Sequence, residues 1–143
     1  MTNKIFLFLS VFAAIAFVTG CSKQVDRSST EESLIGTWSW INTDGGIANN
    51  IHKTPANTGK NIDLKIEADG RYSIYTNDSL SSSGTYVLET RKCIHDHADK
   101  AFINFSFDED MMVESIDKQN LELSDEAYDG IKSYYKRKSM NGK

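Results

Sequence analysis

The stretch NIDLKIEADGRYSIYTN, residues 61–77, decides the fold of this chain. In residues 61–68 apolar and polar side chains alternate strictly, as in a β-strand with one buried face; the apolar positions are Ile62, Leu64, Ile66 and Ala68. Asp69-Gly70, a strong signal for a tight hairpin turn, follows at once. The chain then returns in residues 71–77 as a second strand, whose inner face carries Tyr72 and Ile74. The stretch therefore predicts an antiparallel hairpin.

Further segments have the same character, being short and either alternating in polarity or rich in β-branched and aromatic residues. They are residues 34–41, 84–90, 101–107, 111–117, 120–124 and 131–138. Polar turns and loops separate them, among them residues 78–83, 91–100 and the acidic turn 108–110. No segment shows a sustained helical period with caps. Eight short strands with mostly short connections predict an all-β protein, an eight-stranded antiparallel up-and-down β-barrel.

Residues 42–60 form the one long connection, between the first two strands. They contain Gly45-Gly46, Gly59 and the only proline of the chain, Pro55. Unstructured loops of this length are usually functional or disordered. The apolar anchors are few, Ile47 and Ile51. We therefore expect a mobile lid over the open end of the barrel, whose hydrogen exchange slows when a ligand binds.

The chain begins with the features of an export signal. Lys4 supplies a positive charge, and an uncharged segment, residues 5–18, follows it. That segment is too short to span a bilayer as a helix, which needs about 20 apolar residues. It ends in Val18-Thr19-Gly20-Cys21, which resembles the lipobox of bacterial lipoproteins. The alternative is an ordinary secretory signal followed by a chance cysteine. We favour the lipoprotein, because small residues before the cysteine fit cleavage there.

The lipoprotein resemblance implies cleavage before Cys21, with a diacylglycerol and an N-acyl chain attached to that residue. More than one acyl chain is sufficient for stable anchoring. The expected organisation is a signal peptide over residues 1–20, a flexible polar tether over 21–33, one barrel domain over 34–138 and a C-terminal tail over 139–143. The tether has one apolar residue and no periodicity, so it is not expected to order itself.

The formal net charge of the chain is −4, and its acidic and basic residues are scattered. No basic stripe is present, so the electrostatic footprint of nucleic-acid binding is missing. If Cys21 carries lipid, Cys93 has no partner within the chain. A free thiol is unusual in an exported protein, and we interpret Cys93 as a buried, small apolar residue.

Gly36-Thr37-Trp38 resembles the Gly-x-Trp signature that opens the first strand of lipocalins and related calycins. In that family a basic residue on the last strand packs over the tryptophan, and Arg137 stands at the corresponding place. The chain looks most like small bacterial lipocalin-like lipoproteins over residues 34–138. Further matching motifs are Thr54-Pro55, Asp69-Gly70, Gly84-Thr85-Tyr86 and Asp129-Gly130 with Tyr135. The resemblance implies structural roles for Gly36, Trp38 and Arg137, and a first loop that folds over the barrel mouth.

The inner face of the predicted barrel is rich in large side chains. Trp38 and Trp40 are two positions apart in the first strand, so they lie on the same face, and both should point inward. An eight-stranded barrel is just wide enough to be filled by side chains or to hold one small ligand. Both outcomes stay open, and the long loop, which could cover the barrel mouth, favours a barrel that holds a ligand. The candidate ligand-binding residues are Tyr72, Ile74, Tyr86, Leu88, Ile103 and Phe105.

The segment 93–99 is the one cluster with possible metal ligands. In an extended strand Cys93, His95, His97 and Asp99 would share a face, but side chains on one strand fan out along a line. His52, in the long loop, is the only remote histidine. We therefore expect at most weak metal binding, and an acidic turn rather than a calcium loop at Asp108-Glu109-Asp110. No cofactor is expected.

No catalytic motif was found: the sequence has neither a nucleophile elbow nor a phosphate-binding loop. We therefore expect a non-catalytic lipoprotein, anchored in the outer membrane of a Gram-negative envelope, that binds a small apolar or amphipathic molecule in the barrel. One alternative is a filled barrel that serves as an interaction module for another envelope protein. Another is a metal-binding protein that uses residues 93–99.

Overall fold

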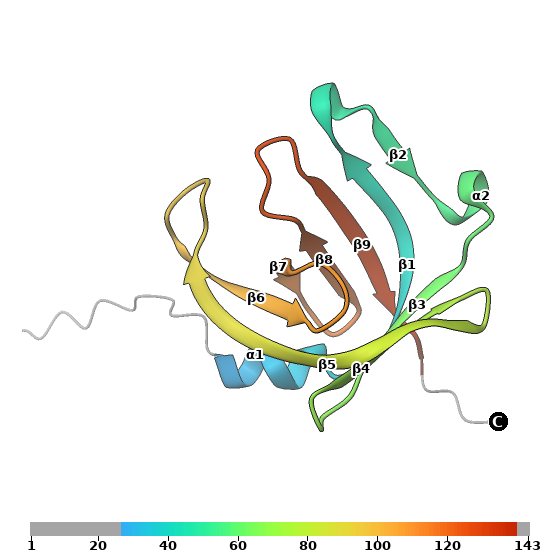
Figure 1. Ribbon diagram of the computed structural model, residues 1–143, viewed down its shortest axis with the longest axis horizontal. Helices are drawn as coiled ribbons and strands as arrows, with labels where there is room; N and C mark the ends of the chain where they lie inside the picture. The colour runs from blue at the N-terminus through green and yellow to red at the C-terminus, as the bar shows by residue number, and fades with distance from the viewer. Residues whose placement is uncertain (1–26, 140–143) are drawn as a thin grey trace, which may run out of the picture.

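The computed structural model describes residues 27–139, which form a β-barrel (Figure 1). Eight strands follow one another as antiparallel neighbours, and the first and last pair with each other to close the barrel. They are β1 (Gly36–Gly45), β3 (Ile62–Ile66), β4 (Arg71–Thr76), β5 (Ser79–Lys92), β6 (Asp99–Phe105), β7 (Met111–Ile116), β8 (Asn120–Ser124) and β9 (Ile131–Arg137). The predicted all-β fold and up-and-down topology are confirmed.

The hairpin of residues 61–77 forms as predicted. Leu64 pairs with Ile74 and Ile66 with Tyr72, and Leu64 and Ile66 are buried. Gly70 takes a φ of +81° in the turn, a conformation that costs glycine little. The strand ends at Ile66, so Ala68 lies beyond it and is exposed, contrary to the expected inward position.

The next turn is shorter than the sequence suggested. Residues 78–83 were predicted as a turn, but β5 begins at Ser79 and its first half pairs with β4. The turn consists of Asn77 and Asp78, both with positive φ, as a two-residue hairpin turn requires. Residues 81–83 are serines that lie in β5, where the side chains are exposed or half-buried. The prediction took their polarity as a sign of a turn, but an exposed strand also accepts polar side chains.

The long connection between β1 and β3 is partly ordered. It contains a 3-10 turn η1 (Ile47–Asn49), a short strand β2 (Ile51–Lys53) and a helical turn α2 (Pro55–Thr58). Strand β2 pairs with the second half of β1, so the sheet has nine strands rather than eight. Thr54 and Asn57 form a capping box at the start of α2, and Gly59 ends it in the left-handed conformation.

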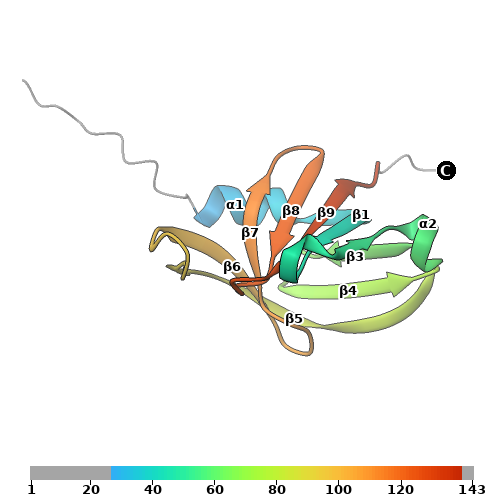
Figure 2. The same ribbon diagram turned by 90° about the horizontal axis from the view of Figure 1, so that it is seen from above.

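Part of the predicted flexible tether is a helix, α1 (Arg27–Leu34). Leu34, which we had expected in the first strand, is its last residue and is fully buried. Thr30, one helical turn earlier, is also buried, so one face of α1 packs on the barrel. Figures 1 and 2 show this helix lying against the barrel beside β5 and β7. Tertiary packing orders residues whose composition alone would not.

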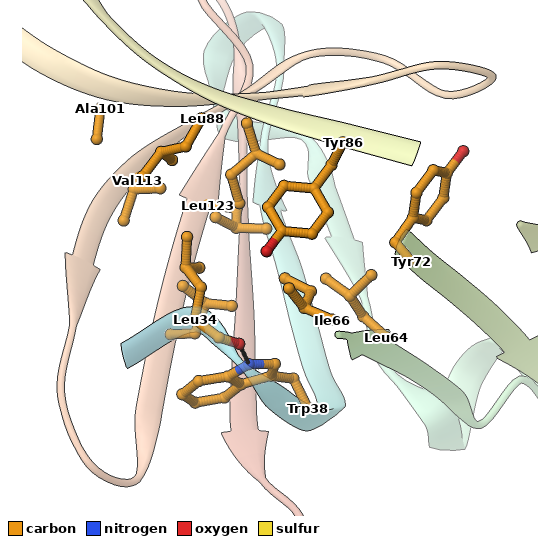
Figure 3. Packing of buried hydrophobic residues seen from close by; sticks show 12 residues of the cluster. Leu34, Trp38, Leu64, Ile66, Tyr72, Tyr86, Leu88, Ala101, Val113 and Leu123 are labelled. Atoms are coloured by element: carbon orange, nitrogen blue, oxygen red, sulfur yellow. Dashed lines mark hydrogen bonds between the residues drawn. The ribbon is translucent and has the colours of Figure 1, made fainter. Parts of the chain in front are cut away.

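The core fills the barrel next to α1 (Figure 3). Its largest fully buried side chains include Trp38, Tyr72, Ile103 and Leu121. Leu34 from the helix and Trp38 from β1 lie together in this core, and the indole Nε1 donates a hydrogen bond to the Leu34 carbonyl at 2.8 Å. The barrel is therefore solid at the end that α1 covers.

Candidate functional site

Arg137 and Trp38 close one end of the barrel. The guanidinium carbon of Arg137 lies 4.0 Å from the centroid of the Trp38 ring, so the predicted pairing is confirmed. The same guanidinium donates hydrogen bonds to the carbonyl oxygens of Ser33 and Ile35, at 2.5 and 2.8 Å. With the bond from Trp38 to Leu34, the carbonyls of the last two residues of α1 accept hydrogen bonds from side chains, and a positive charge lies at the helix C-terminus.

Gly36 makes room for this arrangement. A Cβ atom at this position would collide with Nη1 of Arg137. Its φ of +142° is also one that L-residues rarely adopt. Gly36, Trp38 and Arg137 therefore act together as a structural unit that docks α1 on the barrel.

A hollow opens toward the other end of the barrel. The strand register locates this hollow. Ile66, at the end of β3, pairs with Gly36 beside α1, so Ile62, at the start of β3, lies at the opposite end of the barrel. Strand β7 begins and strand β8 ends at that same opposite end. The hollow has a volume of about 550 Å³. Its lining is formed by Ile62, Leu64, Ile74, Phe105, Phe107, Asp108, Glu109, Met111, Leu123 and Tyr135. We call it the mouth hollow.

The predicted ligand-binding residues divide between the hollow and the core. Ile74 and Phe105 line the mouth hollow. The others, Tyr72, Tyr86, Leu88 and Ile103, are buried in the packed core and do not line it. Tyr72 nevertheless lies next to the hollow, because its ring centroid is 4.7 Å from that of Phe105.

Most of the lining was not singled out by the sequence. Ile62 and Leu64 were recognised as inward-facing, but nothing marked them as lying nearer the mouth than Ile66. Met111, Leu123 and Tyr135 come from the last three strands, whose stagger relative to the hairpin decides which side chains reach the hollow. That stagger is a tertiary property which local alternation does not contain.

The acidic turn 108–110 borders the hollow. Asp108 Oδ2 accepts hydrogen bonds from the hydroxyl groups of Tyr72, at 2.5 Å, and Ser82, at 2.7 Å. Burial and the bond to Asp108 raise the pKa of the Tyr72 phenol, so it remains a donor. Asp110 points elsewhere and lies 3.7 Å from Arg91 Nη1. Asp108 is thus held in place by two hydroxyls at the rim.

Tyr135 brings a phenol into the lining. Burial raises its pKa to about 12, which keeps the phenol neutral at all physiological pH values. Two residues earlier in β9, the Ser133 hydroxyl forms a 2.8 Å hydrogen bond with the Thr43 hydroxyl. The Thr43 hydroxyl also accepts a hydrogen bond from Trp40 Nε1 at 2.9 Å. Trp40 is buried as expected, and its polar edge is satisfied within the barrel wall.

The long connection does not cover the hollow. None of residues 42–60 lines it. Ile47, expected to dip into the mouth, is 71% exposed, and β2 extends the sheet beside β1 (Figure 1). The predicted lid over the barrel mouth is wrong, because backbone pairing of residues 51–53 with β1 directs the connection along the barrel wall.

The segment 93–99 forms the turn between β5 and β6, and Asp99 is the first residue of β6. Cys93 is buried as predicted, in a small cluster with Phe102 and Met112 on the outer face. Arg91 covers this cluster, with its guanidinium carbon 3.8 Å from the Phe102 ring centroid. His95 contacts the ring of Tyr128, whereas His52 lies at 2.8 Å from Asp44 in the β1–β2 hairpin.

Cys93 and His95 line one surface hollow together with Asp96, whereas the other two candidate ligands, His97 and Asp99, do not line it. Asp99 lies 3.1 Å from Lys92, and His97 occupies a turn position with positive φ. Within residues 27–139 no group of three or more His, Cys, Asp or Glu side chains is placed to hold a metal ion. Weak metal binding by the segment 93–99 stays a prediction.

The expected signal peptide, residues 1–20, and the expected lipidation site, Cys21, lie outside the described residues. Among residues 27–139, no helix has the length and apolar character needed to cross a membrane.

Comparisons with protein-family models, with curated proteins and with solved structures gave no match for this chain.

Proposed function

We propose that this chain is a lipid-anchored, lipocalin-like envelope protein that binds a small apolar or amphipathic molecule in the mouth hollow. The observation that carries the proposal is the hollow itself. Its volume of about 550 Å³ falls within the usual range of small-molecule sites, roughly 300–1,000 Å³. Apolar and aromatic side chains form most of its lining, with few polar groups, as is usual for such sites.

The lipocalin-like part of the proposal rests on three features taken together. The barrel has eight antiparallel strands in sequential order, closed by β1 and β9. Gly36 and Trp38 stand at the start of β1, and Arg137 of β9 packs on the indole. The lipid anchor rests on the sequence around Cys21, and with it the placement in a Gram-negative outer membrane.

Binding is proposed rather than catalysis because of what the lining contains. The ionisable side chains of the hollow are Asp108, Glu109 and Tyr135. None of them forms a nucleophile–base pair of the kind that covalent catalysis needs. The alternative, a filled barrel that serves another envelope protein, is less well supported because the barrel is open at this end.

The test is native mass spectrometry of the protein purified from its own envelope. We expect a mass excess equal to one small molecule. Ile62→Trp places a large ring at the start of β3 in the hollow and should abolish the excess. Leu80→Trp is the matched control, because Leu80 is 58% exposed and lies outside the hollow. Protein without an adduct, or an adduct that survives Ile62→Trp, contradicts the proposal.

A further inference from the structure

We propose that the mouth hollow selects amphipathic cations, with the apolar part of the molecule inside the hollow and a positively charged head group at Asp108 and Glu109. This inference rests on the proposed function and names the class of ligand for the same site. It follows from the distribution of charge around the hollow, from the geometry of Asp108 and from the exposed ring of Phe107.

All charged side chains that line the mouth hollow are acidic. Asp108 and Glu109 line the hollow, and no lysine, arginine or histidine does. Among the side chains described, those of residues 29–139, neither carboxylate has an ion-pair partner, whereas the next residue, Asp110, is paired with Arg91. Two unpaired carboxylates at an apolar opening attract a cation and repel an anion. A fatty acid carboxylate would therefore meet like charge at the rim.

Asp108 is positioned before any ligand arrives. Tyr72 and Ser82 donate their hydroxyl hydrogens to one oxygen, Oδ2. The other oxygen, Oδ1, accepts no hydrogen bond from the described residues and is free for a ligand. Because the carboxylate is already fixed by two donors, binding an ammonium group costs little further ordering of this side chain.

Phe107 adds an aromatic surface beside the carboxylates. It is 78% exposed, which is unusual for a phenylalanine, and it is part of the lining. The face of an aromatic ring attracts ammonium groups, and aromatic side chains are used in proteins to recognise quaternary ammonium ligands. The apolar lining then accepts the tail: Ile62, Ile74 and Met111 contribute to it.

The test compares three amphiphiles with the same tail, at concentrations below their micelle thresholds: decyltrimethylammonium, decyl maltoside and decyl sulfate. The protein is the mature chain, residues 21–143, with Cys21→Ser so that no acyl chain competes for the hollow. The closed barrel and its core lie within residues 27–139, so this chain keeps the whole folded unit. Calorimetric titration should give about tenfold tighter binding of the cation than of the maltoside, and weaker binding still of the sulfate.

Two variants separate the site from general electrostatics. The double variant Asp108→Asn, Glu109→Gln should remove the preference for the cation and leave maltoside binding within about twofold. Asp110→Asn changes the net charge of the same turn by removing one of the three carboxylate partners of Arg91, and it should leave the preference in place. Circular dichroism confirms that each variant is folded.

The outcomes distinguish this inference from the proposed function. Binding of all three amphiphiles with equal affinity, or tightest binding of decyl sulfate, overturns the selection of cations and leaves the proposed function standing. A cation preference that survives in the double variant also overturns it, because the charge then acts from elsewhere. Failure of all three to bind overturns both.

Discussion

Removal of the Arg137 guanidinium should destabilise the barrel strongly, although the side chain is only half-buried. The group donates hydrogen bonds to the carbonyls of Ser33, Ile35 and Lys118, and it lies over Trp38. A hydrogen bond from a charged group contributes about 1.5–3 kcal/mol, and a cation–π contact about 0.5–2 kcal/mol. These contributions are not additive, and one of the bonds is exposed, so we expect Arg137→Ala to lower the free energy of unfolding by about 3–4 kcal/mol.

Arg137→Lys should have an intermediate effect, about 2 kcal/mol. An ammonium keeps the charge near Trp38 but cannot donate in three divergent directions as the guanidinium does. Lys136→Ala is the matched control, because Lys136 is the neighbouring residue of β9, is exposed, and makes no side-chain hydrogen bond or ion pair within residues 27–139. It should change stability by no more than about 0.5 kcal/mol.

Urea titration followed by the fluorescence of Trp38 and Trp40 measures these differences. With a slope of about 1.5 kcal/mol per molar urea, a loss of 3 kcal/mol lowers the midpoint by about 2 M. The reasoning is refuted if Arg137→Ala differs from Lys136→Ala by less than about 1 kcal/mol, or if Arg137→Lys is as stable as the unchanged protein. Either result would mean that α1 docks on the barrel without help from the guanidinium.

Three further predictions concern the anchor, the segment 93–99 and alkaline pH. Cys21→Ser should block incorporation of radiolabelled palmitate, and continued labelling of the variant would exclude lipidation at this residue. Zinc titration of the mature chain should show weak binding only, and a submicromolar affinity that disappears in the double variant His95→Ala, His97→Ala would establish a metal site. Burial raises the folded-state pKa of Tyr135 to about 12, whereas an unfolded tyrosine titrates near pH 10, so the unfolded chain releases its proton first and stability should fall between about pH 10 and 12. Urea titrations across this pH range should show a smaller fall in the free energy of unfolding for Tyr135→Phe than for the unchanged protein. The same dependence on pH in both proteins would show that the phenol is not buried in the folded protein.

The barrel was predictable because its evidence is local. Strict alternation in residues 61–68, followed by Asp69-Gly70, determines a hairpin with one buried face, and similar segments repeat along the chain. The contact between Arg137 and Trp38 was predictable through a family resemblance, since nothing in their separation of almost a hundred positions indicates proximity.

The parts that sequence analysis missed depend on partners distant in the chain. Helix α1 has weak helix-forming character, and it is fixed by burial of Leu34 and by bonds from Arg137 and Trp38 to the carbonyls of its last two residues. Strand β2 has three residues and forms because β1 extends past β3 and offers a free edge. Neither feature leaves a periodic signal.

The mouth hollow was missed in most of its lining for the same kind of reason. Alternation identifies which side chains face inward but not how far along the barrel each one lies. Tyr86 and Leu88 have the same inward pattern as Ile74, yet they belong to the solid part of the core. The depth of each residue follows from strand stagger, which is set by pairing across the whole barrel.

The central claim, that the mouth hollow binds a small molecule, is tested most directly by two adjacent methionines. Met111 lines the hollow, whereas Met112 is buried in the cluster on the outer face of the barrel. With carbon-13 labelled methionine methyl groups, titration with the uncharged decyl maltoside should shift the Met111 resonance progressively and leave that of Met112 unchanged. An unchanged Met111 resonance, or a shift of Met112 alone, would contradict binding in the hollow.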